Sequence, residues 1–209
     1  MKPTNWDDYY NNPVGLASYT RLYTQRWIIK TMLSYTQNES FSIAEFGGGN
    51  SCFHDGVLSS CKVAKYVIYD NNDIGVKKFH EKYKKNKTSS AINCDLLSSD
   101  VEEKNEYDIV FSVGLIEHFD EAGTAELIKK HFDAVKPGGI VIITAPTPTI
   151  LYRVIRCAAE CLGVWRFHDE RPLFKQEVHY QVEKFGEILN QKLLWAVGLT
   201  QYAVVARKN

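Results

Sequence analysis

The chain has 209 residues, of which 44% are hydrophobic, so it can bury one sizeable core, and we expect a single domain over residues 1–209. Its 25 acidic and 25 basic residues give a formal net charge of zero, which disfavours nucleic acid as a partner. The first residues lack an apolar signal segment, and no apolar run is long enough to span a bilayer. We therefore expect a cytoplasmic protein without stable membrane insertion, and the sequence indicates no particular oligomeric state.

The five cysteines do not form a metal-binding or disulfide pattern. None of them is part of a Cys-x-x-Cys pair, and their number is odd. Cys157 and Cys161 are spaced to share a helix face, but no histidine or further cysteine stands at ligand spacing beside them. We expect reduced thiols and no metal site.

The N-terminal region, residues 1–40, is predicted to form a helical cap. Apolar residues recur at helical spacing over residues 16–35. Residues 43–46 then form an apolar strand that runs directly into Gly47 to Gly49. Because glycine lacks a Cβ, this turn allows a nucleotide-like cofactor to lie against bare backbone. A short helix over residues 53–60 is predicted to follow.

The second strand ends in an acid. Residues 65–70 form a β-type run that ends at Asp70, about twenty residues after the glycines, which is the distance at which a βαβ unit brings a carboxylate to a ribose. A dinucleotide-binding turn would carry a third glycine where Cys52 stands, so NAD is the weaker interpretation. A helix over residues 76–85 follows, with its lysines on the solvated face.

Strands and helices continue to alternate in the middle of the chain. Residues 90–93 and 107–112 are predicted to form two short strands. A helix over residues 121–135 is stopped by Lys136-Pro137-Gly138-Gly139, because proline and glycine do not continue it. Residues 140–145 form a continuous apolar run, which is typical of a central strand covered on both faces.

Residues 147–180 interrupt the alternation and are predicted to be an insertion in the substrate region, with a helix over residues 150–162. A helix over residues 182–190 follows, and the runs at 193–197 and 201–206 are close enough to pair as a hairpin. This order predicts an α/β fold with a mostly parallel sheet, helices on both faces and an antiparallel C-terminal β-hairpin.

These segments, from about residue 41 to residue 145, resemble the class I S-adenosylmethionine-dependent methyltransferases. The resemblance implies a Rossmann-like sheet of seven strands and S-adenosylmethionine as cofactor. In that family the glycine turn lies against the methionine part of the cofactor, an acid binds the ribose, and two further segments lie near the adenine and after the fourth strand. The positions that match these cofactor-binding roles are Glu45, Gly47, Gly48, Gly49, Asp70, Asn71, Asp95, Leu96, Ser112 and Val113.

Methyl transfer to an alcohol requires a general base, because a hydroxyl does not ionise at pH 7. His118 is the first candidate, since the segment after the fourth strand faces the cofactor in the family and histidine titrates near neutrality. His168 and His179, in the insertion, are the second candidates. The alternatives are a hydrogen-bonded structural histidine at 118 and a salt-bridged lid that includes Arg166 and Arg171.

Missing motifs narrow the acceptor to a small molecule. No Asn/Asp-Pro-Pro-Tyr follows the fourth strand, which disfavours methylation of DNA bases, and Ser112 stands where a metal-dependent enzyme of this family would carry an acid. We predict O-methylation of a saccharide or related polar acceptor, in polysaccharide biosynthesis. We expect the substrate to contact aromatic rings, which cap the site or stack on a sugar ring, and carboxylates, which bind its hydroxyl groups. These residues are Tyr9, Tyr10, Trp165, Asp169, Glu170 and Tyr180.

Two other functions remain open at the level of sequence. The helix over residues 150–162 places Arg153 and Arg156 among apolar residues, so it could dock on a membrane and reach a lipid-linked or quinone acceptor. A methyltransferase-like domain could also bind a metabolite or partner without catalysis. Loss of the glycines or of Asp70 would favour that function, and all of them are present.

Overall fold

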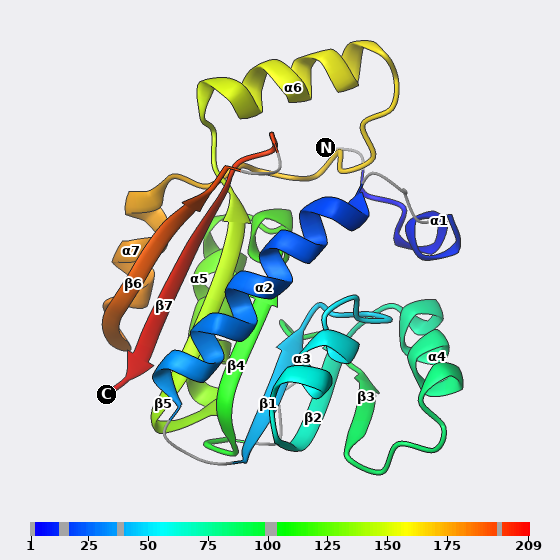
Figure 1. Ribbon diagram of the computed structural model, residues 1–209. Coiled ribbons are helices and arrows are strands. Elements are labelled where there is room, and N and C mark those ends of the chain that lie inside the picture. Colours follow the sequence, from blue (N-terminus) through cyan, green and yellow to red (C-terminus); the bar gives the residue numbers. More distant parts are fainter. Residues whose placement is uncertain (1–2, 13–16, 37–39, 99–103, 196–197) are drawn as a thin grey trace.

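A seven-stranded sheet forms the centre of the protein (Figure 1). The computed structural model describes residues 3–12, 17–36, 40–98, 104–195 and 198–209. The strand order is β3-β2-β1-β4-β5-β7-β6. The strands are β1 (Phe41–Phe46), β2 (Val63–Asp70), β3 (Ser89–Asn93), β4 (Tyr107–Val113), β5 (Val135–Pro146), β6 (Gly186–Leu194) and β7 (Gln201–Lys208).

The pairing within the sheet confirms the predicted fold class. Strands β1 to β5 pair in parallel, whereas β7 runs antiparallel to both β5 and β6. The sheet reverses its order between β1 and β4. In an open α/β sheet this reversal creates a crevice at the carboxyl ends of the strands, where ligands bind.

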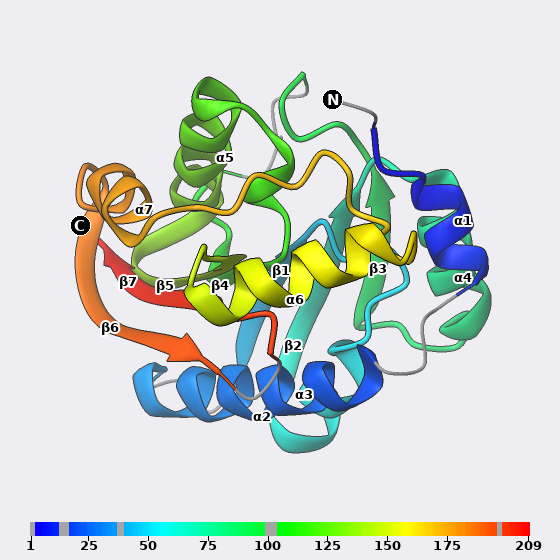
Figure 2. The same cartoon turned by 90° about the horizontal axis from the view of Figure 1, so that it is seen from above.

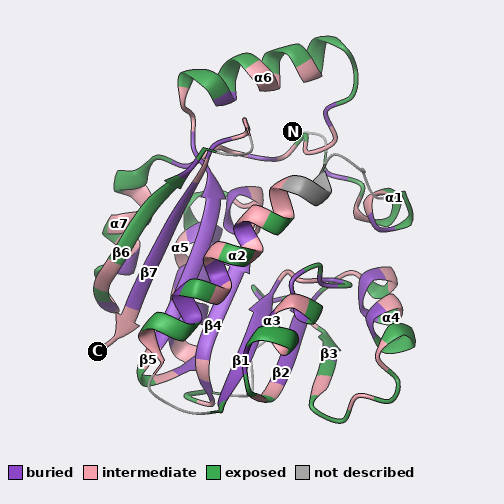
Figure 3. Cartoon of the chain, viewed as in Figure 1, coloured by how far each residue is buried: buried purple, intermediate pink, exposed green. Residues whose placement is uncertain are grey.

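Helices cover both faces of the sheet (Figure 2). One face carries α2 (Ala17–Tyr35), α3 (His54–Ser60) and α4 (Asp73–Lys82), and the other carries α5 (Glu121–Ala134) and α7 (Lys175–Val182). The central strands are buried nearly throughout (Figure 3). Ile28 and Met32 of α2 are fully buried in the core, so α2 belongs to the main body as well as to the N-terminal cap.

Short polar side chains cap the N-termini of four of the described helices, three of which lie after the first strand. Asn72 accepts a hydrogen bond from the Gly75 amide at the start of α4, and Asp120 does the same for Gly123 at the start of α5. Thr149 accepts one from Tyr152 at the start of α6 (Ile150–Cys161). Each cap satisfies an amide that has no partner within the helix, which fixes where the helix begins.

Three short elements surround the carboxyl ends of the strands. These are α1 (Trp6–Asn11), the 3-10 turn η1 (Ile116–His118) and α6. Figures 1 and 2 both place α6 across these strand ends, separate from the helices that cover the two faces. The insertion therefore lies above the crevice between β1 and β4.

The prediction for the C-terminal region was partly wrong. A helix was predicted over residues 182–190, but only Val182 is helical, as the last residue of α7. The chain forms β6 from Gly186 onward. Strand β6 lies at the edge of the sheet, and most of its residues, including Glu187 and Lys192, are exposed. A register shift between Ile188 and Asn190 also breaks its alternation. A polar, irregular edge strand therefore carries little periodic signal.

The predicted run at 193–197 belongs to the end of this strand, and residues 196 and 197, like residue 16 of the first predicted helix, lie outside the described residues. The prediction of a strand over 201–206 was correct, as β7. Within the described ranges, no helix combines the length and apolar character needed to span a membrane.

Candidate active site

A cavity of about 760 Å³ lies at the carboxyl ends of the strands. Its wall includes Glu45 at the end of β1, Asp70 at the end of β2 and Val113 at the end of β4. The helices α1 and α6 and the segment after α6 complete it. The cavity therefore occupies the crevice where the strand order reverses.

The glycine turn has the backbone conformation that its sequence predicts. Gly47 and Gly49 have φ values of +69° and +51°, which residues with a Cβ rarely adopt. Gly48 packs closely on Glu45, since a Cβ built on Gly48 would lie 2.7 Å from the Glu45 carboxyl carbon. The turn thus presents backbone rather than side chains to the cavity.

The Glu45 side chain packs against the glycine turn. Its Oε2 accepts hydrogen bonds from Ser51 Oγ and Tyr66 OH, both at 2.6 Å. Burial raises the pKa of this carboxyl to about 7, although both hydrogen bonds act in the opposite direction. Glu45 is therefore engaged by protein groups and holds the turn in place.

Asp70 lies beside the turn at the end of β2. Its Oδ1 accepts a hydrogen bond from the Asn72 amide at 2.8 Å, and its Oδ2 accepts one from Tyr10 OH at 3.3 Å. Burial raises the pKa of this carboxyl. The Tyr10 ring also packs against Gly49, so α1 closes the cavity next to the acid and the turn. Asn71, Asp95 and Leu96 line the same part of the cavity.

Ser112 is placed differently from the other predicted cofactor contacts. Its side chain is fully buried, and Oγ lies 2.9 Å from Nε2 of His131 in α5. The hydroxyl therefore packs in the core between β4 and α5, and Ser112 is not part of the cavity wall. Its neighbour Val113 does line the cavity.

His118 lies in the cavity wall at the end of η1. Its Nδ1 is 2.8 Å from Oδ1 of Asp169, and the Trp6 ring packs edge-on to the imidazole with 5.0 Å between ring centroids. Burial lowers the pKa of His118, while Asp169 partly opposes the shift. Burial therefore favours the neutral imidazole, and the tautomer with its proton on Nδ1 would donate to the Asp169 carboxylate.

Asp169 connects this histidine to the N-terminus. Its Oδ2 accepts a hydrogen bond from the Thr4 amide at 2.9 Å, and its Oδ1 accepts one from the Thr4 hydroxyl. These bonds and the pairing with His118 lower the pKa of Asp169. One carboxylate thus orients the imidazole and anchors the segment that precedes α1.

Glu170 and Trp165 lie on the α6 side of the cavity. Glu170 Oε1 accepts a hydrogen bond from Tyr152 OH and lies 3.8 Å from a nitrogen of Arg156. The Arg156 guanidinium also packs over the Trp165 ring at 5.1 Å. On the other side, Tyr9 packs against Phe167 with 5.6 Å between ring centroids. Aromatic rings and carboxyl groups therefore share this end of the cavity.

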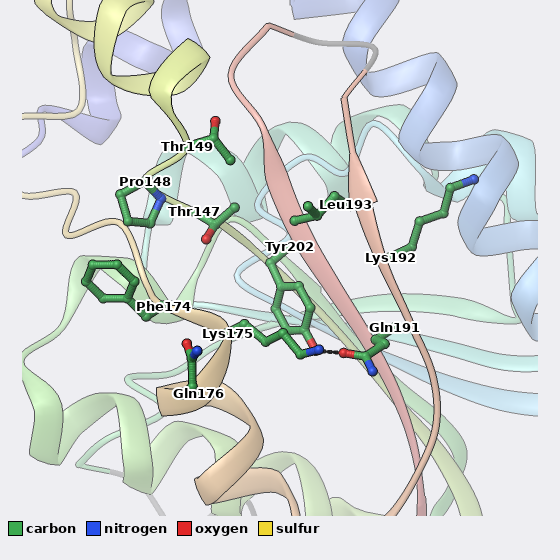
Figure 4. Close-up of a pocket in the computed structure, with 10 residues that line it drawn as sticks. All are labelled: Thr147, Pro148, Thr149, Phe174, Lys175, Gln176, Gln191, Lys192, Leu193 and Tyr202. Atoms are coloured by element: carbon green, nitrogen blue, oxygen red, sulfur yellow. Dashed lines mark hydrogen bonds between the residues drawn. The ribbon is translucent and has the colours of Figure 1, made fainter.

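Besides Ser112, three predicted site residues lie away from the cavity. His168 is exposed and does not line it. Tyr180 is 65% exposed on α7, where Lys184 packs over its ring. His179 Nε2 contacts Tyr202 OH, whose hydroxyl also donates to Gln191 Oε1 at 3.1 Å. Tyr202 lines a separate open groove of about 390 Å³ between α7 and the sheet edge, so His179 belongs to that side of the molecule (Figure 4).

The prediction missed many residues of the cavity wall, among them Trp6, Glu117 and Tyr152. Trp6 and Tyr152 belong to α1 and α6, whose positions over the strand ends are a tertiary property. Glu117 had a local signal, because it is an acid beside His118 in an otherwise apolar segment. Among the described residues, no group of three or more metal-ligating side chains is brought together.

Comparisons with known proteins agree with this geometry. Residues 43–139 match the family model described as a methyltransferase domain. No curated protein sequence matches the chain. Magnesium protoporphyrin IX methyltransferase from Synechocystis PCC 6803, solved with bound S-adenosylhomocysteine (SAH), has a TM-score of 0.73 at 12% identity, with 97% of each chain covered. N-methyltransferase NodS from Bradyrhizobium japonicum WM9, solved with SAH, has a TM-score of 0.68 at 10% identity, with 98% of this chain and 93% of that chain covered.

The sheet order, the glycine turn and the acid at the end of β2 are those of a Rossmann-like methyltransferase fold. The family match over residues 43–139 and the SAH-bound structures that share this fold agree with the prediction of a methyltransferase that uses S-adenosylmethionine.

Proposed function

We propose that the protein transfers a methyl group from S-adenosylmethionine to a hydroxyl of a saccharide or related polar small molecule, with His118 as general base. The observation that carries this proposal is the shared cavity. The glycine turn, Asp70 and the His118–Asp169 pair all belong to it or lie directly against it.

The cofactor end of the cavity fits S-adenosylmethionine. The bare backbone of the turn can lie against the amino-acid part, and the Asp70 carboxylate can accept ribose hydroxyl groups. Asp95 and Leu96 would border the base. When bound, this cofactor supplies an electrophilic methyl group, and transfer of that group leaves SAH.

His118 has the geometry of a general base. Because Asp169 holds the Nδ1 proton, Nε2 is the basic nitrogen that can take the hydroxyl proton of the acceptor. The lowered pKa keeps this nitrogen unprotonated at pH 7. The carboxylate of Asp169 stabilises the imidazolium that forms as the oxygen acquires the methyl group.

The other end of the cavity suits a ring with polar substituents. Trp165 and Phe167 offer aromatic faces for stacking, and Glu170 offers a carboxylate for hydroxyl groups. This arrangement supports a saccharide, although His168, His179 and Tyr180 do not line the cavity.

Calorimetric titration tests the cofactor. We expect S-adenosylmethionine and SAH to bind with micromolar affinity and NAD to show no binding, because Cys52 replaces the third glycine of a dinucleotide turn. SAH production from a panel of saccharides then tests turnover. Binding of NAD, or of neither cofactor, would contradict the proposal. Tight S-adenosylmethionine binding with no product from any acceptor would favour a binding domain without catalysis.

A second acceptor class is supported by α6. Its inner side, with Tyr152 and Ile155, lines the cavity, while its outer side exposes Ile150 (85%) and Val154 (61%) to solvent. An amphipathic helix at the mouth of an active site can rest on a bilayer and admit a lipid-linked acceptor.

Vesicle flotation tests whether the acceptor is lipid-linked rather than a free polar small molecule. If the acceptor is lipid-linked, the protein should float with phosphatidylcholine vesicles containing phosphatidylglycerol, and Val154→Asp should reduce the floated fraction severalfold. Leu33→Asp is the matched control, because Leu33 is similarly exposed (54%) but lies on α2. Absence of flotation by the unaltered protein, or equal loss in both variants, would exclude this role for α6.

A further inference from the structure

Glu117 is an unusual member of the cavity wall. It is only 2% exposed, and its Oε2 has no hydrogen-bond partner among the residues that the structure describes. Its backbone carbonyl accepts a hydrogen bond from the Arg171 amide at 2.8 Å, which fixes the residue in place. A buried carboxylate oxygen without a partner is costly, so a ligand that supplies a donor would be favoured there.

The charged groups around Glu117 are mostly acidic. Burial raises the pKa of Glu117 well above its ordinary value, and the nearby carboxyls of Glu170 and Asp169 raise it further. Burial also raises the pKa of Glu170. A nearby cation would stabilise the ionised form of both carboxyl groups, which burial and mutual repulsion disfavour. The site is therefore receptive to a positive charge.

The neighbouring arginines are already engaged. Arg156 is shared between Glu170, at 3.8 Å, and Glu160, at 2.8 Å. Both terminal nitrogens of Arg171 bond to Glu177, at 3.0 and 2.7 Å. Neither arginine forms an ion pair with Glu117 in the described part of the chain, so a counter-ion for Glu117 would come from a ligand.

Aromatic rings complete the surroundings. Trp6, Trp165 and Phe167 line the same cavity, and Phe167 lies 6.1 Å from Trp6 and 5.9 Å from Trp165 between ring centroids. The faces of such rings attract cations, especially in a site shielded from water. Buried acids together with aromatic rings therefore favour an ammonium group over a neutral hydroxyl or amide.

We propose that Glu117 and Glu170 form a subsite for a protonated amino group of the acceptor, which makes the acceptor an amino sugar or amino alcohol. This inference rests on the proposed function and narrows its substrate class. The ammonium group would anchor the acceptor by donating to Glu117 Oε2, while a neighbouring hydroxyl is presented to His118.

Calorimetry on the SAH-saturated protein tests the subsite without requiring turnover. The probes are glucosamine, N-acetylglucosamine and glucose, which share a ring and differ in charge. We expect glucosamine to bind at least about tenfold more tightly than either neutral sugar, because one charge-assisted hydrogen bond is lost in the others. Titrations in two buffers of different ionisation enthalpy should also reveal proton release from the carboxyl pair when glucosamine binds.

Single substitutions test which carboxyl group produces the preference for glucosamine. Glu117→Gln keeps the shape of the side chain and should abolish both the glucosamine preference and the proton release. Glu170→Gln should reduce the preference less, because Arg156 already neutralises part of its charge. Glu126→Gln on α5, where the carboxylate is 44% exposed and faces Lys129, is the matched control and should behave as the unaltered protein.

The outcomes separate the two proposals. Equal affinity for the three sugars, no measurable binding of any of them, or a preference that survives in Glu117→Gln would overturn the ammonium subsite. If SAH itself fails to bind, the proposed methyl transfer fails instead. SAH binding with a preference for N-acetylglucosamine would mean that Glu117 acts as a neutral acid that donates to a carbonyl, which also overturns the inference.

Discussion

Replacing Asp70 by asparagine is expected to weaken binding of S-adenosylmethionine by about 10- to 100-fold. The substitution removes the negative charge that would accept the ribose hydroxyls in a buried position. The asparagine Oδ1 can still accept the hydrogen bond from the Asn72 amide that now ends on Asp70 at 2.8 Å. The start of α4 should therefore be preserved, and the loss should appear in the dissociation constant measured by calorimetry.

The matched control for this substitution is Asp73→Asn. Asp73 is three positions further along the chain, exposed in the first turn of α4, and it bonds to Asn93 instead of lining the cavity. It should leave the affinity unchanged. If Asp70→Asn bound the cofactor as tightly as the unaltered protein, with a normal melting temperature, Asp70 would have no role in the ribose site.

The parallel half of the fold was predictable because its signals are local. Most of its strands contain a short apolar run, Gly47 directly follows β1, and Asp70 is the last residue of β2. In a parallel sheet the carboxyl ends of the strands meet at one edge. Residues at consecutive strand ends therefore converge whatever the details of packing, and the glycine turn and acid were found for this reason.

The edge strand β6 and the short helix α1 were less predictable from the sequence. Strand β6 is held by backbone pairing with β7, and its exposed residues carry no apolar alternation. Helix α1 has six residues, too few for a helical period to emerge, and it is stabilised by contacts such as Lys78 to the Tyr10 carbonyl at 2.7 Å. Such elements depend on partners that are distant in the sequence.

The histidines illustrate the same limit within the site. His118 follows β4 and was placed correctly in the cavity by that position. His168 is adjacent to Asp169 in sequence, yet only Asp169 reaches the imidazole of His118 while His168 faces solvent. In an irregular segment the direction of a side chain is set by tertiary contacts, and no spacing rule predicts it.

Replacing His118 by glutamine should lower kcat by about 10²- to 10⁴-fold if the imidazole is the base. Cofactor affinity should stay within about twofold, because His118 is paired with Asp169 and packs on Trp6 rather than on the glycine turn. His168→Gln is the matched control, since that histidine is exposed and outside the cavity. A decrease in kcat smaller than about threefold for His118→Gln would remove the histidine from the mechanism.

The pH profile gives an independent test of the same imidazole. A base acts only when unprotonated, so kcat/KM should be level near pH 7 and fall on the acid side as pH drops through the pKa of His118, which burial lowers from its ordinary value. Asp169→Asn removes the carboxylate that raises this pKa, so the acid limb should move to lower pH. The maximum rate should nevertheless fall, because the amide no longer holds the proton on Nδ1 or stabilises the imidazolium. An acid limb that stays in place in Asp169→Asn would assign it to a group other than His118.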